Sequence, residues 1–308
     1  MRGGNSKRAE RPDRFRNSGR NHLYSVRNDG EHTLHRMAGN EDVYRLPAVA
    51  AVYAEGSQLF PPEETILRLL LPELRTARML DLGVGGGRTT PHFAKSVREY
   101  VGADYSESMI RECQRRFTAY PDRLSFVVCD ARSLRMFASG SFDFILFSMN
   151  GIDSVNHRDR LTVLKEIQRV ARPGGWFCFS SHNLNFGARF FEWRQMIRLH
   201  PRFARRTAAW FLARFVHNWR VSAATLQRSQ HMIIAERAHS RWMPTYYIRP
   251  GEQLSQLREH FSDVRVFSFA SGAEILGREA LRDAPDMCLY YLCRVRPLQL
   301  RQAFFSSR

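Results

Sequence analysis

The sequence predicts an α/β fold in which helices cover both faces of a mostly parallel, seven-stranded sheet. Short apolar runs alternate with amphipathic stretches of helical spacing from residue 78 onward, a pattern typical of right-handed βαβ units. A glycine-rich stretch directly follows the first apolar run, at the place where open α/β sheets bind nucleotides. With 308 residues, 44% of them hydrophobic, the chain can bury one substantial core and carry additional elements.

The organisation of the chain follows from its composition. Residues 1–37 lack apolar periodicity and predict a disordered basic arm. Residues 38–75 predict an N-terminal helical cap, because Pro61-Pro62-Glu63-Glu64 places prolines in a first helical turn and carboxylates near the positive end of the helix dipole. The α/β domain is expected at 76–296, followed by a flexible tail at 297–308.

Five consecutive apolar runs predict parallel strands, and amphipathic stretches predict the helices between them. The expected strands are Arg78–Leu82, Tyr100–Asp104, Leu124–Cys129, Phe142–Phe147 and Trp176–Ser181. The expected helices are Thr89–Val97, Ser106–Phe117 and Arg158–Val170, the last ending at Arg172-Pro173-Gly174-Gly175 because proline and glycine do not continue a helix. Later in the chain we expect a helix at Pro250–His260 and an antiparallel strand pair, Val264–Phe269 and Cys288–Val295, at the sheet edge.

Residues 185–245 interrupt this alternation with about sixty arginine- and aromatic-rich positions, which we expect to be mainly helical. The formal net charge of +17 is concentrated there and in the 1–37 arm. A basic patch can attract nucleic acid, anionic lipid or an acidic substrate. Because lysine occurs only at Lys7, Lys95 and Lys165, the arginine excess could equally reflect codon usage in a GC-rich genome.

The five cysteines are odd in number and form no CxxC pair, so the sequence favours neither a disulfide framework nor a zinc cluster, and we expect no metal. No stretch approaches the roughly 20 apolar residues of a membrane span, and no apolar run follows the basic N-terminus. We therefore expect a cytoplasmic protein without an integral membrane segment.

The glycine loop follows the first strand as Leu80-Asp81-Leu82-Gly83-Val84-Gly85-Gly86-Gly87. Glycines permit positive φ and a close approach of the backbone to a ligand. Arg88 occupies the position where a dinucleotide fingerprint needs a third glycine or alanine, which disfavours NAD, and the absence of Gly-Lys-Ser/Thr excludes a Walker loop. Asp81 would repel a pyrophosphate but could hold an ammonium group, directly or through water.

Two further carboxylates end the next two strands. Asp104 lies about twenty residues beyond the glycine loop, where it could accept hydrogen bonds from a ribose diol. Asp130 could accept a hydrogen bond from the exocyclic amino group of adenine, while the adjacent backbone meets the ring edge. An adenosine would then bridge strands two and three.

Together these motifs resemble the class I S-adenosylmethionine-dependent methyltransferase family, especially its bacterial members with an Asp-x-Gly-x-Gly-x-Gly loop. The resemblance covers roughly residues 45–295 and implies a Rossmann-like sheet that binds S-adenosylmethionine. It places Met109 near the adenine, with ordinary core packing as the alternative, and Ser148 near the methionyl group. The expected cofactor-binding residues are Asp81, Gly83, Gly85, Gly87, Asp104, Tyr105, Met109, Asp130, Ala131 and Ser148.

Methyl transfer from a sulfonium chiefly requires alignment of the acceptor and exclusion of water. A base helps when the acceptor is a hydroxyl, and His182, just beyond the fifth strand, is our candidate, with a structural histidine as the alternative. Asn150 is a second catalytic candidate, and Asp153 and His157 are weaker ones in the same loop. The expected acceptor-binding residues are Asn150, His182, Tyr246 and Tyr247.

The loop Phe147-Ser148-Met149-Asn150-Gly151 lacks the Asn/Asp-Pro-Pro-aromatic motif of related base-amino methyltransferases, which disfavours methylation of a base amino group. We expect O- or N-methylation of a small molecule bound under the 185–245 insertion. An RNA methyltransferase that uses Trp193, Trp210 and Trp219 for stacking remains an alternative, as does a noncatalytic cofactor-binding protein. The 185–245 insertion is expected to be a lid over the substrate. A membrane contact through Ala208–Val216 or an RNA platform are the other interpretations.

Overall fold

The computed structural model describes residues 40–118, 123–189, 216, 218–219, 221–238 and 241–296. The predictions for the 1–37 arm and the 297–308 tail lie outside these residues. The same holds for Trp193, Trp210 and most of the Ala208–Val216 stretch, on which the RNA and membrane interpretations depend.

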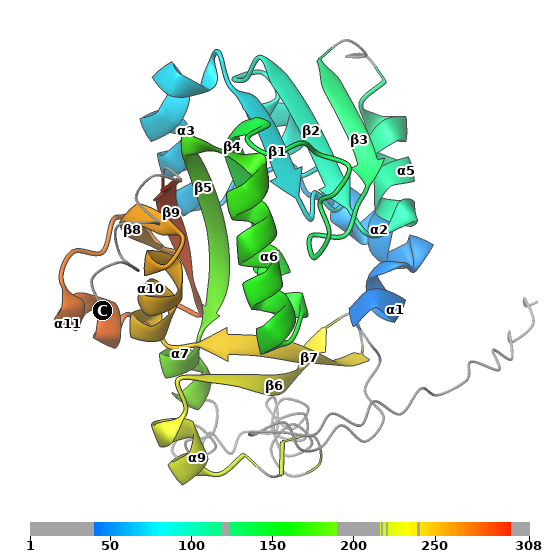
Figure 1. Cartoon of the computed structure of the whole chain (residues 1–308). Helices are drawn as coiled ribbons and strands as arrows, with labels where there is room; N and C mark the ends of the chain where they lie inside the picture. Colours follow the sequence, from blue (N-terminus) through cyan, green and yellow to red (C-terminus); the bar gives the residue numbers. More distant parts are fainter. Residues whose placement is uncertain are drawn as a thin grey trace, which may run out of the picture.

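The sheet has nine strands in the order β3-β2-β1-β4-β5-β7-β6, with β9 added to β5 and β8 added to β9 (Figure 1). The first five strands in this order are mutually parallel, and β8 pairs antiparallel with β9, which confirms the predicted fold class and edge pair. The strands are β1 (Arg78–Leu82), β2 (Glu99–Asp104), β3 (Leu124–Val128), β4 (Phe142–Phe147), β5 (Ala171–Asn183), β6 (His231–Ala238), β7 (Arg241–Ile248), β8 (Phe261–Ser268) and β9 (Cys288–Val295).

The helices between the parallel strands also follow the prediction, although α4 is shorter than the spacing indicated. Within the described ranges, no helix is long and apolar enough to cross a membrane. The α-helices are α1 (Asn40–Tyr44), α2 (Pro47–Glu55), α3 (Pro61–Leu74), α4 (Thr90–Phe93), α5 (Glu107–Arg116), α6 (His157–Val170), α7 (Leu184–Arg189), α9 (Ala223–Arg228), α10 (Pro250–Arg258) and α11 (Arg278–Asp283).

Two apolar clusters cover the two faces of the sheet. On one face, α6 and α10 pack against side chains such as Leu80 and Ile145. On the other face, α3, α4 and α5 pack against Met79 and Phe144, the neighbours in sequence of those residues. This alternation is the period of two that a strand buried on both faces requires. It fixes the register of the strands. Because the strands are parallel, their carboxyl ends lie together along one side of the sheet, called here the carboxyl edge.

From His231 onward the 185–245 insertion forms a β-hairpin, so the prediction that the insertion is mainly helical is wrong there. Its two strands, β6 and β7, pair antiparallel from His231↔Ile248 to Ala238↔Arg241. The stretches His-Met-Ile-Ile-Ala and Trp-Met-Pro-Thr-Tyr-Tyr-Ile are rich in the aromatic and β-branched residues that favour strands. The count of seven strands is corrected to nine for this reason.

The hairpin crosses the carboxyl edge of the sheet because β5 is longer than β4. The last residue pair between these two strands is Phe147↔Phe179, and β7 joins β5 beyond it, at His182↔Tyr247 and Asn183↔Ile248. Since β9 occupies the other edge of β5 through His182, β7 must lie on the edge that β4 leaves unpaired. Figure 1 shows the hairpin running beneath the parallel strands toward α1.

The far end of the hairpin docks against the N-terminal helices. Asn40 of α1 donates hydrogen bonds from Nδ2 to the carbonyl oxygens of Pro244 (3.0 Å) and Ser154 (2.6 Å). Met243 of β7 packs in one apolar cluster with Val43 and with Met109 of α5. The N-terminal helices and the hairpin therefore cover the carboxyl edge together, where the sequence places its candidate site.

Candidate functional site

The glycine loop leaves β1 in a backbone conformation that favours glycine. Gly83, Gly85 and Gly87 have φ angles of 61°, 55° and 82°. At Gly86 a side chain is excluded by packing instead, because a Cβ atom would lie 2.5 Å from the backbone nitrogen of Ala54 in α2. The loop therefore meets both the sheet edge and the N-terminal helices through bare backbone.

Asp104, at the carboxyl end of β2, organises this loop. Its Oδ2 accepts a hydrogen bond from the Gly85 N–H (3.0 Å), and its Oδ1 accepts one from the Ser106 N–H (2.9 Å). The side chain is buried, and burial raises the pKa of Asp104. Each carboxylate oxygen has a second lone pair that these bonds leave available. The donor and acceptor groups here thus fit the ribose diol of a nucleoside.

Asp81 lies beneath the loop and is bonded within the protein. Its Oδ2 accepts hydrogen bonds from the Thr89 hydroxyl (2.5 Å) and the Tyr100 hydroxyl (2.6 Å). Burial raises the pKa of Asp81 to about 6, although both hydroxyl bonds act in the opposite direction. Because the residue is only 1% exposed, a contact with an ammonium group through water suits this position better than a direct one.

Asp130 is bound by Arg132, two residues later in the chain. The Arg132 Nη2 lies 2.6 Å from Asp130 Oδ2, and the Arg132 backbone N–H donates to Oδ1 at 2.8 Å. Burial opposes ionisation of this carboxyl, but Arg132 outweighs it and lowers the pKa of Asp130. An adenine amino group would therefore share Asp130 with the Arg132 guanidinium.

Three of the other expected cofactor residues, Tyr105, Met109 and Ser148, contact the N-terminal helices. The Tyr105 hydroxyl donates to the Asn40 carbonyl at 3.4 Å, and Met109 packs against Val43, which favours the core-packing alternative for this methionine. The Ser148 hydroxyl lies 2.9 Å from that of Tyr290 and also donates to Glu63. Ala131 is partly buried beside the core.

Glu63 of α3 and Arg88 form a buried ion pair that the sequence analysis missed. The two guanidinium nitrogens of Arg88 donate to the two carboxylate oxygens of Glu63, both at 2.6 Å. Glu63 also accepts hydrogen bonds from the Phe60 N–H (2.8 Å) and the Tyr290 hydroxyl (2.9 Å). Arg88, noted in the sequence only as an obstacle to NAD, thus fastens the glycine loop to α3.

His182 and Asp153 form the arrangement expected of a general base and its orienting carboxylate. His182 Nδ1 lies 2.8 Å from Asp153 Oδ2, and His182 Nε2 lies 3.2 Å from Nδ2 of Asn150. Asn150 has left-handed backbone geometry (φ 59°) and donates its N–H to Ser180 Oγ at 2.7 Å. With Nδ1–H donating to Asp153, the Nε2 lone pair of neutral His182 can accept a proton.

A buried arginine holds Asp153 in place. Arg160, fully buried in α6, donates from Nη1 to Asp153 Oδ1 at 2.5 Å and from Nη2 to Ser181 Oγ at 3.0 Å. Gln253 of α10 accepts another hydrogen bond from Arg160. Burial lowers the pKa of His182, but the hydrogen bond and charge of Asp153 outweigh it, so the pKa of His182 is raised overall.

The two tyrosines expected in the acceptor pocket lie in different surroundings. The Tyr247 ring lies 4.9 Å from the His182 ring, on the neighbouring parallel strand. The side chain of Tyr246 alternates to the other face, where its hydroxyl bonds His157 Nδ1 at 2.7 Å and its ring packs on the Arg160 guanidinium. The structure therefore brings Asn150, Asp153, His182 and Tyr247 together, and places Tyr246 and His157 apart from them.

Three residues near these groups were not predicted. The rings of Tyr44 and Tyr53, from α1 and α2, lie 6.0 Å apart. Burial raises the pKa of both hydroxyls, and the Asp104 carboxylate adds to the effect. Glu236 of β6 accepts a hydrogen bond from the Tyr247 hydroxyl. The sequence carries no motif for them, because their proximity depends on the docking of α1 and the hairpin.

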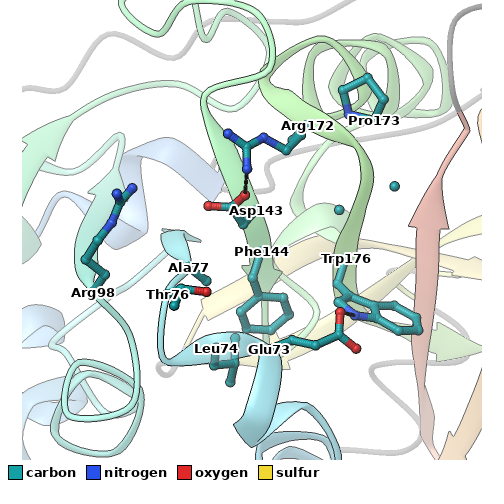
Figure 2. Close-up of a pocket in the computed structure, with 12 residues that line it drawn as sticks. Glu73, Leu74, Thr76, Ala77, Arg98, Asp143, Phe144, Arg172, Pro173 and Trp176 are labelled. Carbon is teal, nitrogen blue, oxygen red and sulfur yellow. Dashed lines mark hydrogen bonds and ion pairs between the residues drawn. The ribbon is translucent and has the colours of Figure 1, made fainter.

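A cavity of about 490 Å³ lies at the opposite edge of the sheet, at the amino ends of β1, β4 and β5. Figure 2 shows Asp143 beneath Arg172, to which it is bonded at 2.7 Å, and Phe144 between Leu74 and Trp176. Ligands of open α/β sheets bind at the carboxyl ends of the strands. We therefore place the candidate site at the other edge, with His182 and the glycine loop.

Comparisons with known proteins show which proteins this chain resembles. Residues 79–175 match a family model described as a methyltransferase domain. The demethylmenaquinone methyltransferase of Clavibacter sepedonicus is 40% identical over 98 residues, which are 32% of this chain and 38% of that protein. The fatty-acid O-methyltransferase of Mycolicibacterium smegmatis is 34% identical over 106 residues, 33% of this chain and 36% of that protein. The chain thus spans less than two fifths of the length of these curated relatives.

A solved structure is similar over most of the chain. The 1,6-didemethyltoxoflavin-N1-methyltransferase of Burkholderia thailandensis, with bound 1,6-didemethyltoxoflavin and S-adenosylhomocysteine, superposes with a TM-score of 0.52 at 18% identity. The similarity covers 86% of this chain and 94% of that one. At this identity it shows a shared fold alone.

Proposed function

We propose that this chain, which carries a class I S-adenosylmethionine-dependent methyltransferase domain, transfers a methyl group to oxygen or nitrogen of a small-molecule acceptor. The observation that carries the proposal is the pair His182–Asp153, whose Nδ1 and Oδ2 atoms lie 2.8 Å apart. It stands at the same sheet edge as the glycine loop. The curated relatives are named for small acceptors, a demethylmenaquinone and a fatty acid, which supports the class of acceptor.

The cofactor would be held by the glycine loop and Asp104. Asp104 keeps one lone pair on each oxygen for the ribose diol, while the loop backbone approaches the methionyl part. Tyr44 and Tyr53 would close the adenosine side of the site from the N-terminal helices. When bound, S-adenosylmethionine supplies a methyl group already activated by a sulfonium.

The chain's own chemistry is positioning and proton transfer. Asp153 would hold His182 as the Nδ1–H tautomer, so that Nε2 carries the lone pair, which an acceptor would reach by displacing the Asn150 Nδ2 contact. Asn150, 3.2 Å from that nitrogen, would orient the acceptor, and Tyr247 would pack against it. The hairpin and α1 would exclude water from the sheet edge.

Calorimetric titration with S-adenosylmethionine, S-adenosylhomocysteine and NAD tests the cofactor. We expect the first two to bind and NAD not to bind. Asp104→Ala should weaken binding of both at least about tenfold. It removes the acceptor of the diol hydrogen bonds and leaves the N–H groups of Gly85 and Ser106 without their partner. The control is Asp283→Ala, whose side chain is 66% exposed in α11.

Transfer of labelled methyl groups to a panel of hydroxyl and amine compounds then tests the reaction. Transfer that disappears in His182→Asn while cofactor binding persists would support the base. Intact cofactor binding without transfer to any compound would favour the noncatalytic alternative. Absence of cofactor binding would refute the proposed function itself.

A further inference from the structure

Glu236 occupies the face of the hairpin that looks toward the candidate base. It pairs across the hairpin with Met243, and Met243 and Tyr247 are four residues apart on β7, so all three side chains share one face. Tyr247 in turn neighbours His182 on the adjoining strand. The hydrogen bond from the Tyr247 hydroxyl to the Glu236 carboxylate agrees with this placement.

Groups from three separate elements surround this carboxylate. Burial is the main cause of the raised pKa of Tyr44 in α1 and Tyr247 in β7, and the negative charge of Glu236 adds to it. The same charge also supports the raised pKa of His182 in β5, next to the larger contribution of Asp153. The charge of Glu236 therefore acts on groups of the N-terminal helices, the hairpin and β5.

The neighbours of Glu236 on this face of the hairpin pack in apolar clusters. Met243 belongs to the cluster with Val43 and Met109, and Tyr247 packs with Ile234 and Leu184. An acceptor with an apolar body would therefore be accommodated, and its polar end would meet the few polar groups present.

Those polar groups are hydrogen-bond acceptors. Asn150 is 8% exposed, and its Oδ1 has no hydrogen-bond partner among the described residues. When Nδ1–H donates to Asp153, His182 Nε2 is also an acceptor, and an acceptor N–H would replace the Asn150 Nδ2 group that now lies 3.2 Å from it. Among the described side chains, which do not include those of Arg237 and Arg241, no arginine or lysine forms an ion pair with Glu236. A ligand that brings hydrogen-bond donors and a positive charge is complementary to this set.

We propose that Glu236 selects the methyl acceptor, and that the acceptor is a primary or secondary aliphatic amine bound as its ammonium ion. This inference rests on the proposed function. The ammonium N–H groups would donate to Glu236 and Asn150 Oδ1, and a carboxylate-bearing acceptor would be repelled by the same Glu236.

The reaction would proceed in two balanced steps. One ammonium proton passes to His182 Nε2, which leaves a neutral amine and an imidazolium. The amine lone pair then forms the N–CH3 bond while the methyl–sulfur bond breaks and its electron pair stays on sulfur. The products are a methylammonium ion and S-adenosylhomocysteine, and the proton on His182 leaves to solvent.

A binding experiment tests the selection without relying on turnover. The protein saturated with S-adenosylhomocysteine is titrated calorimetrically with three probes of equal chain length: n-octylamine, n-octanol and n-octanoate. We expect the amine to bind about tenfold more tightly than the alcohol, and octanoate to bind more weakly than either. Glu236→Gln retains an oxygen for the Tyr247 hydroxyl but removes the charge, so it should reduce the preference for the amine to about twofold or less. The control is Glu279→Gln, an exposed residue of α11.

The possible outcomes separate the two proposals. Equal binding of amine and alcohol in the unmodified protein, or no binding of any probe, would overturn the selection by Glu236. An amine preference that survives in Glu236→Gln would overturn it as well. An amine preference that depends on Glu236, without methyl transfer from S-adenosylmethionine to octylamine, would instead count against the proposed function alone.

Discussion

Asp153 sets the basicity of His182, because its carboxylate holds the imidazole Nδ1 and raises the pKa of the ring above its usual 6.5. A base must be deprotonated to act, so activity should rise with pH through this raised pKa. Asp153→Asn removes the charge that favours the imidazolium, and the acid limb of the kcat/KM profile should move to lower pH while kcat falls about a hundredfold or more. The measurement is a pH profile over pH 5 to 9.

This substitution also leaves Arg160 buried without its counter-ion, at a cost of about 3 kcal/mol or more, so folding must be checked by thermal unfolding. The pair Asp153→Asn with Arg160→Met removes both charges and should restore stability but not the acid limb. Ser181→Ala is the control, since it keeps both charges and removes a hydroxyl that bonds Asp153 and Arg160. A folded Asp153→Asn protein with an unchanged acid limb would contradict the assignment.

The position of a carboxylate or glycine that directly follows a strand could be predicted from the sequence. The hydrogen-bond partners of such residues were harder to predict. Asp104 and the glycines stand at the carboxyl edge as expected. Arg132 was overlooked as the partner of Asp130, although it lies only two residues away. The Glu63–Arg88 pair joins residues 25 positions apart, and no local pattern in the sequence predicts it.

The contact between α2 and the glycine loop depends on the absence of a side chain at Gly86. Gly86→Ala would bring a Cβ atom to 2.5 Å from the backbone of Tyr53 and Ala54, so α2 must move away. We expect a loss of about 1 to 3 kcal/mol in the free energy of unfolding, together with weaker cofactor binding. Urea unfolding and calorimetry measure the two effects.

Gly251→Ala in α10 is the matched control for this substitution. A Cβ atom at Gly251 meets nothing within 4 Å, and alanine favours a helix over glycine by about 1 kcal/mol, so this variant should be neutral or slightly more stable. Equal effects of the two substitutions would show that packing at Gly86 does not matter.

The elements of the parallel sheet were predictable from periodicity because the same burial pattern repeats along each strand. The hairpin was not, although its residues favour strands, because it follows a long arginine-rich segment and its pairing depends on the edge of β5 that β4 leaves unpaired. That edge arises because β5 runs to Asn183, beyond the end predicted at Ser181. A tertiary pairing thus decided the secondary structure of β6 and β7.

Across the whole molecule, Asn40 ties the N-terminal helices to the hairpin and to the loop after β4. Asn40→Ala removes both hydrogen bonds and should lower the free energy of unfolding by about 1 to 2 kcal/mol. It should also lower the affinity for S-adenosylmethionine severalfold, because α1 and α2 lie against the glycine loop and Asp104. Gln114→Ala, which removes an exposed side-chain bond on α5, is the control and should leave cofactor affinity unchanged. Unaltered affinity in Asn40→Ala would contradict a closing role for α1.

The shared cluster of Val43, Met109 and Met243 has a thermodynamic consequence. A ligand at Asp104 that orders α1 also orders the tip of the hairpin, and a ligand beside Glu236 that orders the hairpin also orders α1. Thermodynamic linkage makes the two effects equal. The factor by which the first ligand raises the affinity for the second is the factor by which the second raises the affinity for the first. We therefore expect positive cooperativity between the binding of nucleoside and acceptor. Release of either product should lower the affinity for the other.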